Sequence, residues 1–154
     1  MRVLAQEEYG LRCLLRVAEL TDAGPAPLSE IASAEGLSPE YAGRLLQRLR
    51  QAGFLDAARG PGGGYRLARP PMGISVRSVI EVFDDPIWSD SFCSCHTGRE
   101  DACVRSFDCS IRALWRSIGQ AVSSVLDGLT LEDLLHHEPE VQGLLQISKM
   151  SRGN

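Results

Sequence analysis

Aromatic residues are scarce in this sequence, and no long apolar run is present. Only 6% of the 154 residues are aromatic, whereas 44% are hydrophobic and 23% charged. We therefore expect one domain, or one domain with an appendage, with a core of Leu, Val, Ile and Ala. No apolar run approaches the roughly 18 residues that a membrane helix needs, and Met1 begins neither a secretory signal nor a transit peptide. These absences predict a soluble, cytoplasmic protein without a membrane partner.

The residue groups that catalysis requires are also missing. The sequence contains no recognisable Ser-His-Asp set, no phosphate-binding loop and no pair of carboxylates in a plausible acid and base site. We therefore expect a protein that is not an enzyme and that has no small-molecule substrate.

The net charge of −4 does not exclude nucleic acid, because the charge is unevenly distributed. Residues 1–70 carry 9 Arg against 8 carboxylates, and residues 71–154 carry 7 basic residues against 12 carboxylates. Within residues 44–69 a single acid, Asp56, stands against six arginines: Arg44, Arg48, Arg50, Arg59, Arg66 and Arg69. Screening confines each charge to a Debye length of ~10 Å, so this patch can bind phosphates on an acidic protein.

Residues 28–53 have the pattern of a helix-turn-helix, and one further helix precedes them. Apolar residues at helical spacing predict helices over residues 7–20 and 28–35, and Gly36 is placed to end the second in the left-handed conformation. Ser38 is a good N-cap for a third helix, in which Leu45, Leu46 and Leu49 point inward. The short turn between the second and third helices is typical of a DNA-binding motif.

A β-hairpin is predicted directly after these helices. The apolar strands 54–59 and 65–67 flank the glycine turn 60–64. A hairpin in this position is a wing, so residues 1–70 are predicted to form a winged helix-turn-helix DNA-binding domain.

The second half of the chain divides into three parts. Residues 71–110 hold a short helix, capped by Ser75 and running from 76 to 83, and a loop with cysteines. Residues 111–135 hold a long helix over 111–129 and a short helix over 131–135, whose start has the capping box of Thr130 and Asp133. Residues 136–154 are predicted to be a tail, unstructured after about residue 147.

The apolar stripe of the 111–129 helix is wider than a small domain needs. The helix either belongs to an internal core or pairs with its twin in a homodimer, which is usual in winged-helix regulators. We favour the dimer, because it places two wings and two recognition helices on a palindromic double-stranded DNA operator. The fold class is therefore mainly α, a winged helix with a long C-terminal dimerisation helix.

Five cysteines are present, and four of them lie within residues 93–109. An odd number of cysteines does not fit a disulfide framework, so the clustering indicates metal or redox chemistry. Cys95-x7-Cys103-x5-Cys109 supplies three thiolates for an iron–sulfur cluster. Zinc, with Cys93 or His96 as a fourth ligand, and free redox thiols are the alternatives, although a Cys-x-x-Cys knuckle for zinc is lacking.

Five segments together resemble one family. They are the first helix, Pro27-Leu-Ser-Glu-Ile-Ala32, residues 38–50, Arg59-Gly-Pro-Gly-Gly-Gly-Tyr65, and the cysteine loop continued by Cys109-Ser-Ile-Arg-Ala-Leu-Trp115. They are similar to the IscR, NsrR and RirA group of bacterial iron–sulfur transcriptional regulators over roughly residues 1–135. The resemblance implies a 2Fe–2S or 4Fe–4S cluster in the loop, and DNA contacts from the wing arginine and glycine.

The DNA contacts are expected on the third helix and the wing. The N-terminal part of a recognition helix enters the major groove, and a wing arginine enters a minor groove or pairs with a phosphate. Gly43 costs ~1 kcal/mol in a helix interior, which a close approach of the backbone to DNA would explain. Arg44 and Arg48 could alternatively belong to a solvated helix face that makes no DNA contact. The predicted set is Ser38, Glu40, Tyr41, Gly43, Arg44, Arg48, Arg59 and Gly60.

The cluster ligands are assigned with the help of the resemblance. Cys95 rather than Cys93 is chosen as the first ligand, because its spacing to Cys103 is nearer that of the family. Some relatives use a His three positions after the last cysteine, where this chain has Arg112. Others use a carboxylate in the first helix that reaches across the dimer, and Glu8 stands at the matching place, although a surface pair with Glu7 is the alternative.

The remaining candidate ligands have weaker support. Cys13 is expected to be a core residue, and His96, His136 and His137 to lie on an exposed loop or helix end. The predicted function is transcriptional control in which the state of the cluster, altered by iron, redox conditions or nitric oxide, reorders the loop and resets the spacing of the DNA-binding domains. A zinc- or thiol-based winged-helix protein, with its domain used for protein contacts or redox sensing, is the alternative.

Overall fold

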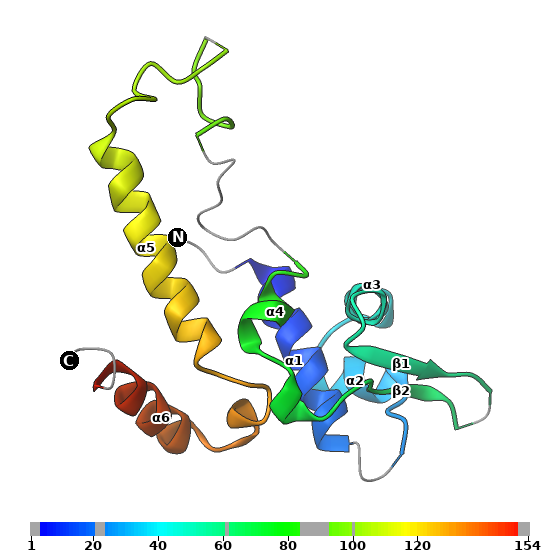
Figure 1. Ribbon diagram of the computed structural model, residues 1–154. Coiled ribbons are helices and arrows are strands. Elements are labelled where there is room, and N and C mark those ends of the chain that lie inside the picture. The colour runs from blue at the N-terminus through cyan, green and yellow to red at the C-terminus, as the bar shows by residue number, and fades with distance from the viewer. Residues whose placement is uncertain (1–3, 21–23, 61, 84–92, 100, 151–154) are drawn as a thin grey trace.

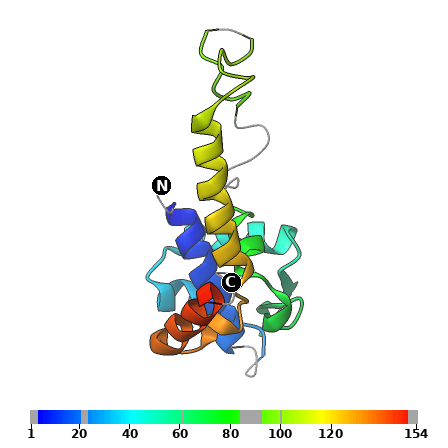
Figure 2. The same ribbon diagram turned by 60° about the vertical axis from the view of Figure 1, so that its left-hand side comes forward.

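The computed structural model describes residues 4–20, 24–60, 62–83, 93–99 and 101–150, with side chains up to residue 146. The helices of residues 5–80 and a hairpin form one body, from which the long helix α5 (Ser110–Asp127) extends (Figure 1). The cysteine-bearing segment lies at the far end of α5, well away from the hairpin, and the turned view shows the same separation (Figure 2).

Helices α2 (Leu28–Glu35) and α3 (Pro39–Gln51) form the predicted helix-turn-helix, and α1 (Ala5–Leu20) packs against both. Gly36 ends α2 with φ 67°, in the left-handed region that favours glycine. Ser38 caps α3, since its side-chain oxygen accepts a hydrogen bond from the Tyr41 amide at 3.2 Å. The helix end predicted at Gly36 and the N-cap predicted at Ser38 are therefore both present in the structure.

The core lies where these helices meet the hairpin and the chain that follows it. Its residues are almost all aliphatic, as the composition indicated, and the buried side chains include Leu14, Val17, Ile31, Leu45, Leu46, Leu49, Phe54, Leu55, Ile74, Val79 and Leu131. Burial of such side chains stabilises the fold by about 1.5–3 kcal/mol each. The recognition helix is thus held firmly by its apolar side.

The wing consists of β1 (Leu55–Ala58) and β2 (Gly64–Leu67), which pair antiparallel. The Gly63 amide donates to the Gly60 carbonyl at 2.9 Å, and a Cβ on Gly63 would lie 2.4 Å from the carbonyl oxygen of Ala58. The turn therefore needs glycine. Ala26 forms a β-bridge with Tyr65 through hydrogen bonds of 2.7 and 2.8 Å, a contact that ties the wing to the α1–α2 connection.

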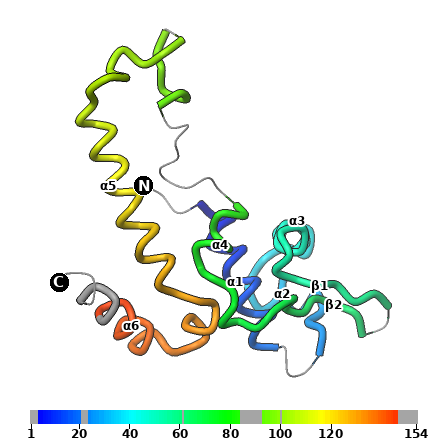
Figure 3. The backbone as a smooth tube through the Cα atoms, viewed as in Figure 1, coloured from blue at the N-terminus to red at the C-terminus, as the bar shows by residue number. Residues whose placement is uncertain are grey.

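The second half of the chain begins with a short 3-10 helix (Pro71–Gly73) and α4 (Val76–Ile80). Helix α4 is shorter than the predicted 76–83 segment, because residues 81–83 form a turn. Helix α5 (Ser110–Asp127) is the predicted long helix, and its path is clearest in the tube view (Figure 3).

The C-terminal end of α5 is anchored to the body of the protein. The Val76 amide donates to the Leu129 carbonyl at 3.0 Å, and the Leu131 amide donates to the Ile74 carbonyl at 2.8 Å. The predicted capping box is formed, since the Asp133 carboxylate accepts from the Thr130 amide at 2.7 Å, but only the 3-10 turn Asp133–Leu135 follows it.

The C-terminal region differs from the prediction of a tail. Helix α6 (Glu138–Met150) occupies most of residues 136–154, while residues 151–154 lie outside the described part. This helix could have been predicted from the helical spacing of three apolar residues, Val141, Leu144 and Leu145. Among the described helices, none is long and apolar enough to cross a membrane.

Candidate functional site

The N-terminal turn of α3 presents a mixed polar surface. Ser38, Glu40 and Arg44 are exposed, and Tyr41 is half-buried. The pKa of the Glu40 carboxyl is below its ordinary value because its own backbone amide and the Ser38 hydroxyl donate to it, with a further contribution from Arg44. A carboxylate held at this helix end can accept from a cytosine amino group, and it disfavours nearby phosphates.

Tyr41 links the exposed end of α3 to α1. Its ring meets that of Tyr9 edge-on, with centroids 6.1 Å apart and the planes at 84°. The Arg44 guanidinium lies 5.5 Å from the centroid of the Tyr41 ring. Since such contacts restrict a flexible arginine, Tyr9 and Tyr41 favour one arrangement of Arg44.

Gly43 and Arg48 face protein, which the sequence did not indicate. A Cβ on Gly43 would point toward Leu28 of α2, with its nearest approach at 3.6 Å. The Arg48 guanidinium donates to the Gln6 side-chain oxygen at 2.9 Å and to the Val82 carbonyl. The Arg48 guanidinium is therefore bound by protein groups in this structure, and its DNA contact stays a prediction.

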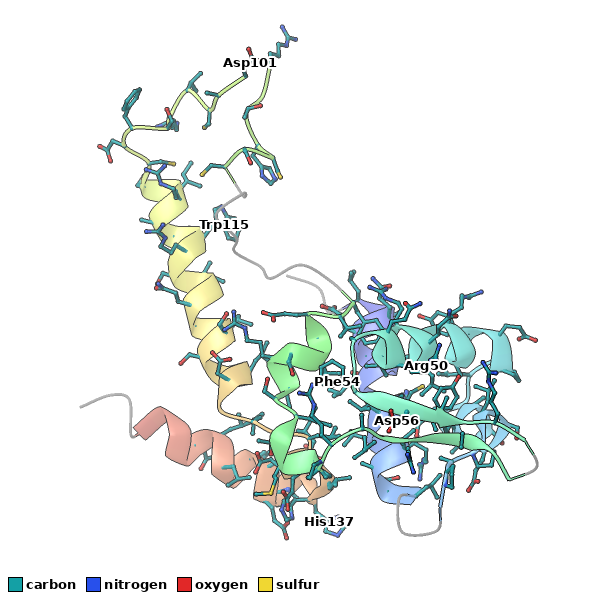
Figure 4. All side chains as sticks on the ribbon, turned by 45° about the vertical axis from the view of Figure 1, so that its right-hand side comes forward. Arg50, Phe54, Asp56, Asp101, Trp115 and His137 are labelled. Atoms are coloured by element: carbon teal, nitrogen blue, oxygen red, sulfur yellow. The ribbon has the colours of Figure 1, made fainter. Side chains whose placement is uncertain are left out.

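The wing carries the other predicted DNA residues. Arg59 and Gly60 are exposed, and Gly60 has φ 95°. Arg50 and Arg66 line an open cavity of about 510 Å³ between the end of α3 and β1, and Figure 4 shows Arg50 and Asp56 on these neighbouring elements. Asp56 lies 3.6 Å from Arg66 and offsets part of the local positive charge.

The cysteine segment is open and built from turns. Cys95 is exposed, whereas Cys93, Cys103 and Cys109 are half-buried. The amides of His96 and Ser106 donate to the carbonyls of Cys93 and Cys103, at 3.3 and 3.0 Å. The described side chains of this segment lie beyond the end of α5, with Asp101 near its tip (Figure 4).

Cys109 has a distinct position as the N-cap of α5. Its Sγ accepts a hydrogen bond from the Arg112 amide at 3.3 Å, where the helix also presents its positive end. This environment suits a sulfur that bears negative charge, as a metal-bound thiolate does. Arg112 thus supports the Cys109 sulfur through its backbone amide.

The donor set fits an iron–sulfur cluster in kind, although the donors are apart. Within the described residues, no three His, Cys, Asp or Glu side chains are gathered as a metal site. Glu8 is exposed in the first turn of α1. Cys13 is fully buried, and burial raises the pKa of its thiol to about 11, with the Glu35 charge adding to the effect. Cys13 is therefore a core residue, as expected.

An ion-pair group behind the helix-turn-helix was not found from the sequence. The Glu35 carboxylate, at the end of α2, accepts from Arg12 Nε at 2.8 Å and from Arg16 Nε at 3.1 Å. Both arginines lie on α1 one turn apart, and this spacing can be seen in the sequence. The sequence does not show that Glu35 is their common partner. The group fixes the turn that precedes the recognition helix.

The helix-turn-helix and the hairpin that follows it define a class, that of the winged-helix proteins. The chain belongs to the Rrf2 family, described as an iron-dependent transcriptional regulator, which matches residues 4–137. The family resemblance noted from the sequence is thereby confirmed.

Individual relatives agree with this assignment. The transcriptional regulator IscR of Aliivibrio salmonicida is 36% identical over 135 residues, which cover 88% of this chain and 77% of the relative. The structure of T. potens IscR superimposes with a TM-score of 0.70 at 32% identity, over 88% of this chain and 86% of that one. The structure of CymR, the global cysteine regulator of B. subtilis, gives 0.67 at 30% identity, over 88% and 96%.

Proposed function

We propose that this protein is a homodimeric regulator whose affinity for a palindromic DNA operator depends on an iron–sulfur cluster. Cys95, Cys103 and Cys109 of one protomer would hold the cluster, and Glu8 of the partner subunit would complete the set. When bound, a cluster supplies a group whose loss, oxidation or reaction with nitric oxide changes the charge and ligation of the loop. The observation that carries the proposal is that the Cys109 sulfur caps the N-terminal end of α5, in a segment that also holds Cys95 and Cys103.

The DNA-binding part of the proposal uses the exposed end of α3 and the wing. Ser38, Glu40, Tyr41 and Arg44 are assigned to the major groove, because they occupy the N-terminal turns of the second helix of the motif. Arg59 and Gly60 are assigned to the backbone or the minor groove. Arg48 and Gly43 are proposed to affect DNA binding indirectly, by fixing the position of α3 against the neighbouring helices.

The dimer is supported by the apolar face of α5. Ile111, Leu114, Trp115 and Val125 expose 53%, 55%, 39% and 38% of their surface, although an isolated helix of this kind would gain by burying them. Gly119 is the buried residue of α5. This partly exposed apolar face runs along the helix from the cysteine segment toward the anchored end. A second copy of α5 would match it in length and can cover it symmetrically.

Glu8 as a ligand from the partner follows from its position. It is exposed on α1, and within the described part of one chain no cysteine group is gathered beside it. Pairing of two α5 helices would bring α1 of one protomer toward the loop of the other. A carboxylate binds iron less strongly than a thiolate does, so this ligand would be the one most easily displaced.

The proposal is tested by anaerobic purification of the full chain. We expect a coloured protein with visible absorbance and stoichiometric iron and sulfide, and a change in DNA affinity when the cluster is removed. DNA selected by the wild-type protein from a random-sequence pool provides the probe. The cluster function would be refuted if the anaerobically purified protein were colourless, lacked iron and still bound this DNA. It would also be refuted if removal of a cluster left the DNA affinity unchanged.

The second candidate is a regulator that works through zinc or free thiols. It is favoured by the likeness to the structure of a cysteine regulator and by the exposure of Cys95. Zinc in the purified protein, or DNA affinity that changes with reversible thiol oxidation in the absence of iron, would support it over the cluster.

A further inference from the structure

Arg48 joins the recognition helix to two other elements. Its guanidinium donates to the Gln6 Oε1 of α1 at 2.9 Å and to the Val82 carbonyl, and it lies 4.9 Å from the centroid of the Phe83 ring. Gln6 closes the group, because its Nε2 donates to the Phe83 carbonyl at 2.9 Å. We call the group of Gln6, Arg48, Val82 and Phe83 the Arg48 clasp.

The sequence explains why a side chain takes these carbonyls. In a longer helix, the carbonyl of Val82 would accept from the amide of residue 86, but residue 86 is a proline and has no amide hydrogen. The carbonyl is therefore left for another donor, and a charged donor makes the stronger bond. Helix α4 ends at Ile80, and Arg48 holds the turn that follows.

The aromatic member of the clasp is tightly packed. Phe83 is 3% exposed, and its ring lies against the backbone of Gly10, where a Cβ would come within 2.3 Å of two ring atoms. Arg48 lies over the same ring. Movement of Phe83 would therefore be transmitted to Arg48 on α3 and to α1, because neither neighbour leaves the ring free space.

In sequence, the clasp adjoins both parts of the chain that are proposed to hold the cluster. Phe83 is the last described residue before the chain continues toward Cys93. Gln6 is two residues before Glu8, in the first turn of α1. Arg48 lies on α3 one turn beyond Arg44, which is assigned to DNA.

We propose that Arg48 is a positioning residue that couples the state of the cysteine loop to the recognition helix. Displacement of Val82 and Phe83, or of Gln6 in the first turn of α1, would change the groups that hold the Arg48 side chain of α3. The orientation of α3 relative to the wing then shifts, and with it the affinity for DNA. This inference rests on the proposed function, since it needs a loop that has two states.

A second attachment offers a competing route. The segment that follows α5 is tied to Ile74 and Val76 by backbone hydrogen bonds, so the loop could also act through α5 alone. That route does not pass through Arg48. A substitution in the clasp therefore separates the two routes.

The experiment measures the ratio of the DNA dissociation constants of the cluster-loaded and metal-free full-length protein. Arg48→Gln is expected to bring this ratio closer to one, by roughly 2- to 30-fold. Gln6→Ala is expected to act in the same direction, and the double variant to add little, because the two side chains belong to one network. Arg50→Gln is the matched control, since it removes an exposed arginine of the same helix and should leave the ratio unchanged.

A second readout does not depend on affinity. In the wild-type protein, hydrogen exchange of the α3 amides is expected to differ between the loaded and metal-free forms, and in Arg48→Gln this difference should be lost. If Arg48→Gln does not fold, Arg48→Lys and Gln6→Ala replace it, because they remove only part of the clasp. Variants that fold and keep the wild-type ratio and exchange difference would overturn the inference. A wild-type ratio of one would instead overturn the proposed function, and the inference with it.

Discussion

Gly43→Ala tests whether the glycine of the recognition helix serves DNA or only the packing of helices. Replacement of glycine by alanine in a helix interior stabilises the helix by about 1 kcal/mol. The new methyl group would meet Leu28 at 3.6 Å, an ordinary van der Waals distance, so no clash offsets the gain. We expect the free energy of unfolding to rise by about 1 kcal/mol and the melting temperature by about 2–4 °C for a chain of this size.

The assay pairs thermal or urea unfolding with DNA binding. Because the methyl group points toward α2, the affinity for the selected DNA should not change. Gly10→Ala is the matched comparison, since its Cβ would come within 2.3 Å of the Phe83 ring. The helix-propensity gains cancel, so the two variants should differ by the overpacking cost of about 1–3 kcal/mol. A Gly43→Ala protein that is more stable but binds DNA weakly would refute this reasoning and favour a close approach of the α3 backbone to DNA.

Five further substitutions test the proposed function. Arg59→Ala should weaken binding at physiological salt and lower the salt slope by about 1, and unchanged affinity would exclude a wing contact. Ile118→Glu should split the dimer or unfold the chain, and a wild-type monomer in sedimentation at micromolar concentration would contradict the dimer. Cys103→Ser should abolish the visible absorbance while Cys93→Ser retains it, and the opposite result would reverse the ligand assignment. Glu8→Ala should alter the absorbance spectrum and shorten the lifetime of the cluster, and a wild-type spectrum and lifetime would exclude Glu8 as a ligand.

Local signals in the sequence predicted the helix-turn-helix well. Ser38 and Gly36 act within one turn of their own position, so their residue types nearly determine the helix ends at which they stand. The capping box of Thr130 and Asp133 likewise involves residues three apart. The glycine turn of the wing was recognisable because few other residues can adopt its backbone conformation.

Contacts between distant residues were not predicted. Arg48 and Val82 are 34 positions apart, and no spacing rule relates them. The exposed face expected for Arg48 was a reasonable inference from helical periodicity, but periodicity does not show which neighbouring element lies against a helix face. The bridge of Ala26 to Tyr65 was missed for the same reason, since it joins a proline-rich connection to a strand.

The candidate ligands could be chosen from their spacing and chemistry. How they come together in one site could not be predicted from the sequence. Cys95, Cys103 and Cys109 are donors of the correct type, yet in one described chain they do not form a gathered site. A ligand from a second protomer cannot be located from one sequence, because the two-fold arrangement determines where Glu8 lies relative to the loop. The fold was therefore more predictable than the site.

Helix α5 has one fixed end and one distant end, so it acts mechanically as a lever. Its 18 residues span about 27 Å at 1.5 Å per residue. A tilt of about 10° around the anchor at Ile74 and Leu131 would sweep the far end through about 5 Å, given that length. A displacement of the cysteine segment therefore becomes smaller toward the anchored end of α5. In the proposed function, a change of the cluster would reach the packed core around Ile74 and Leu131 only as a short displacement.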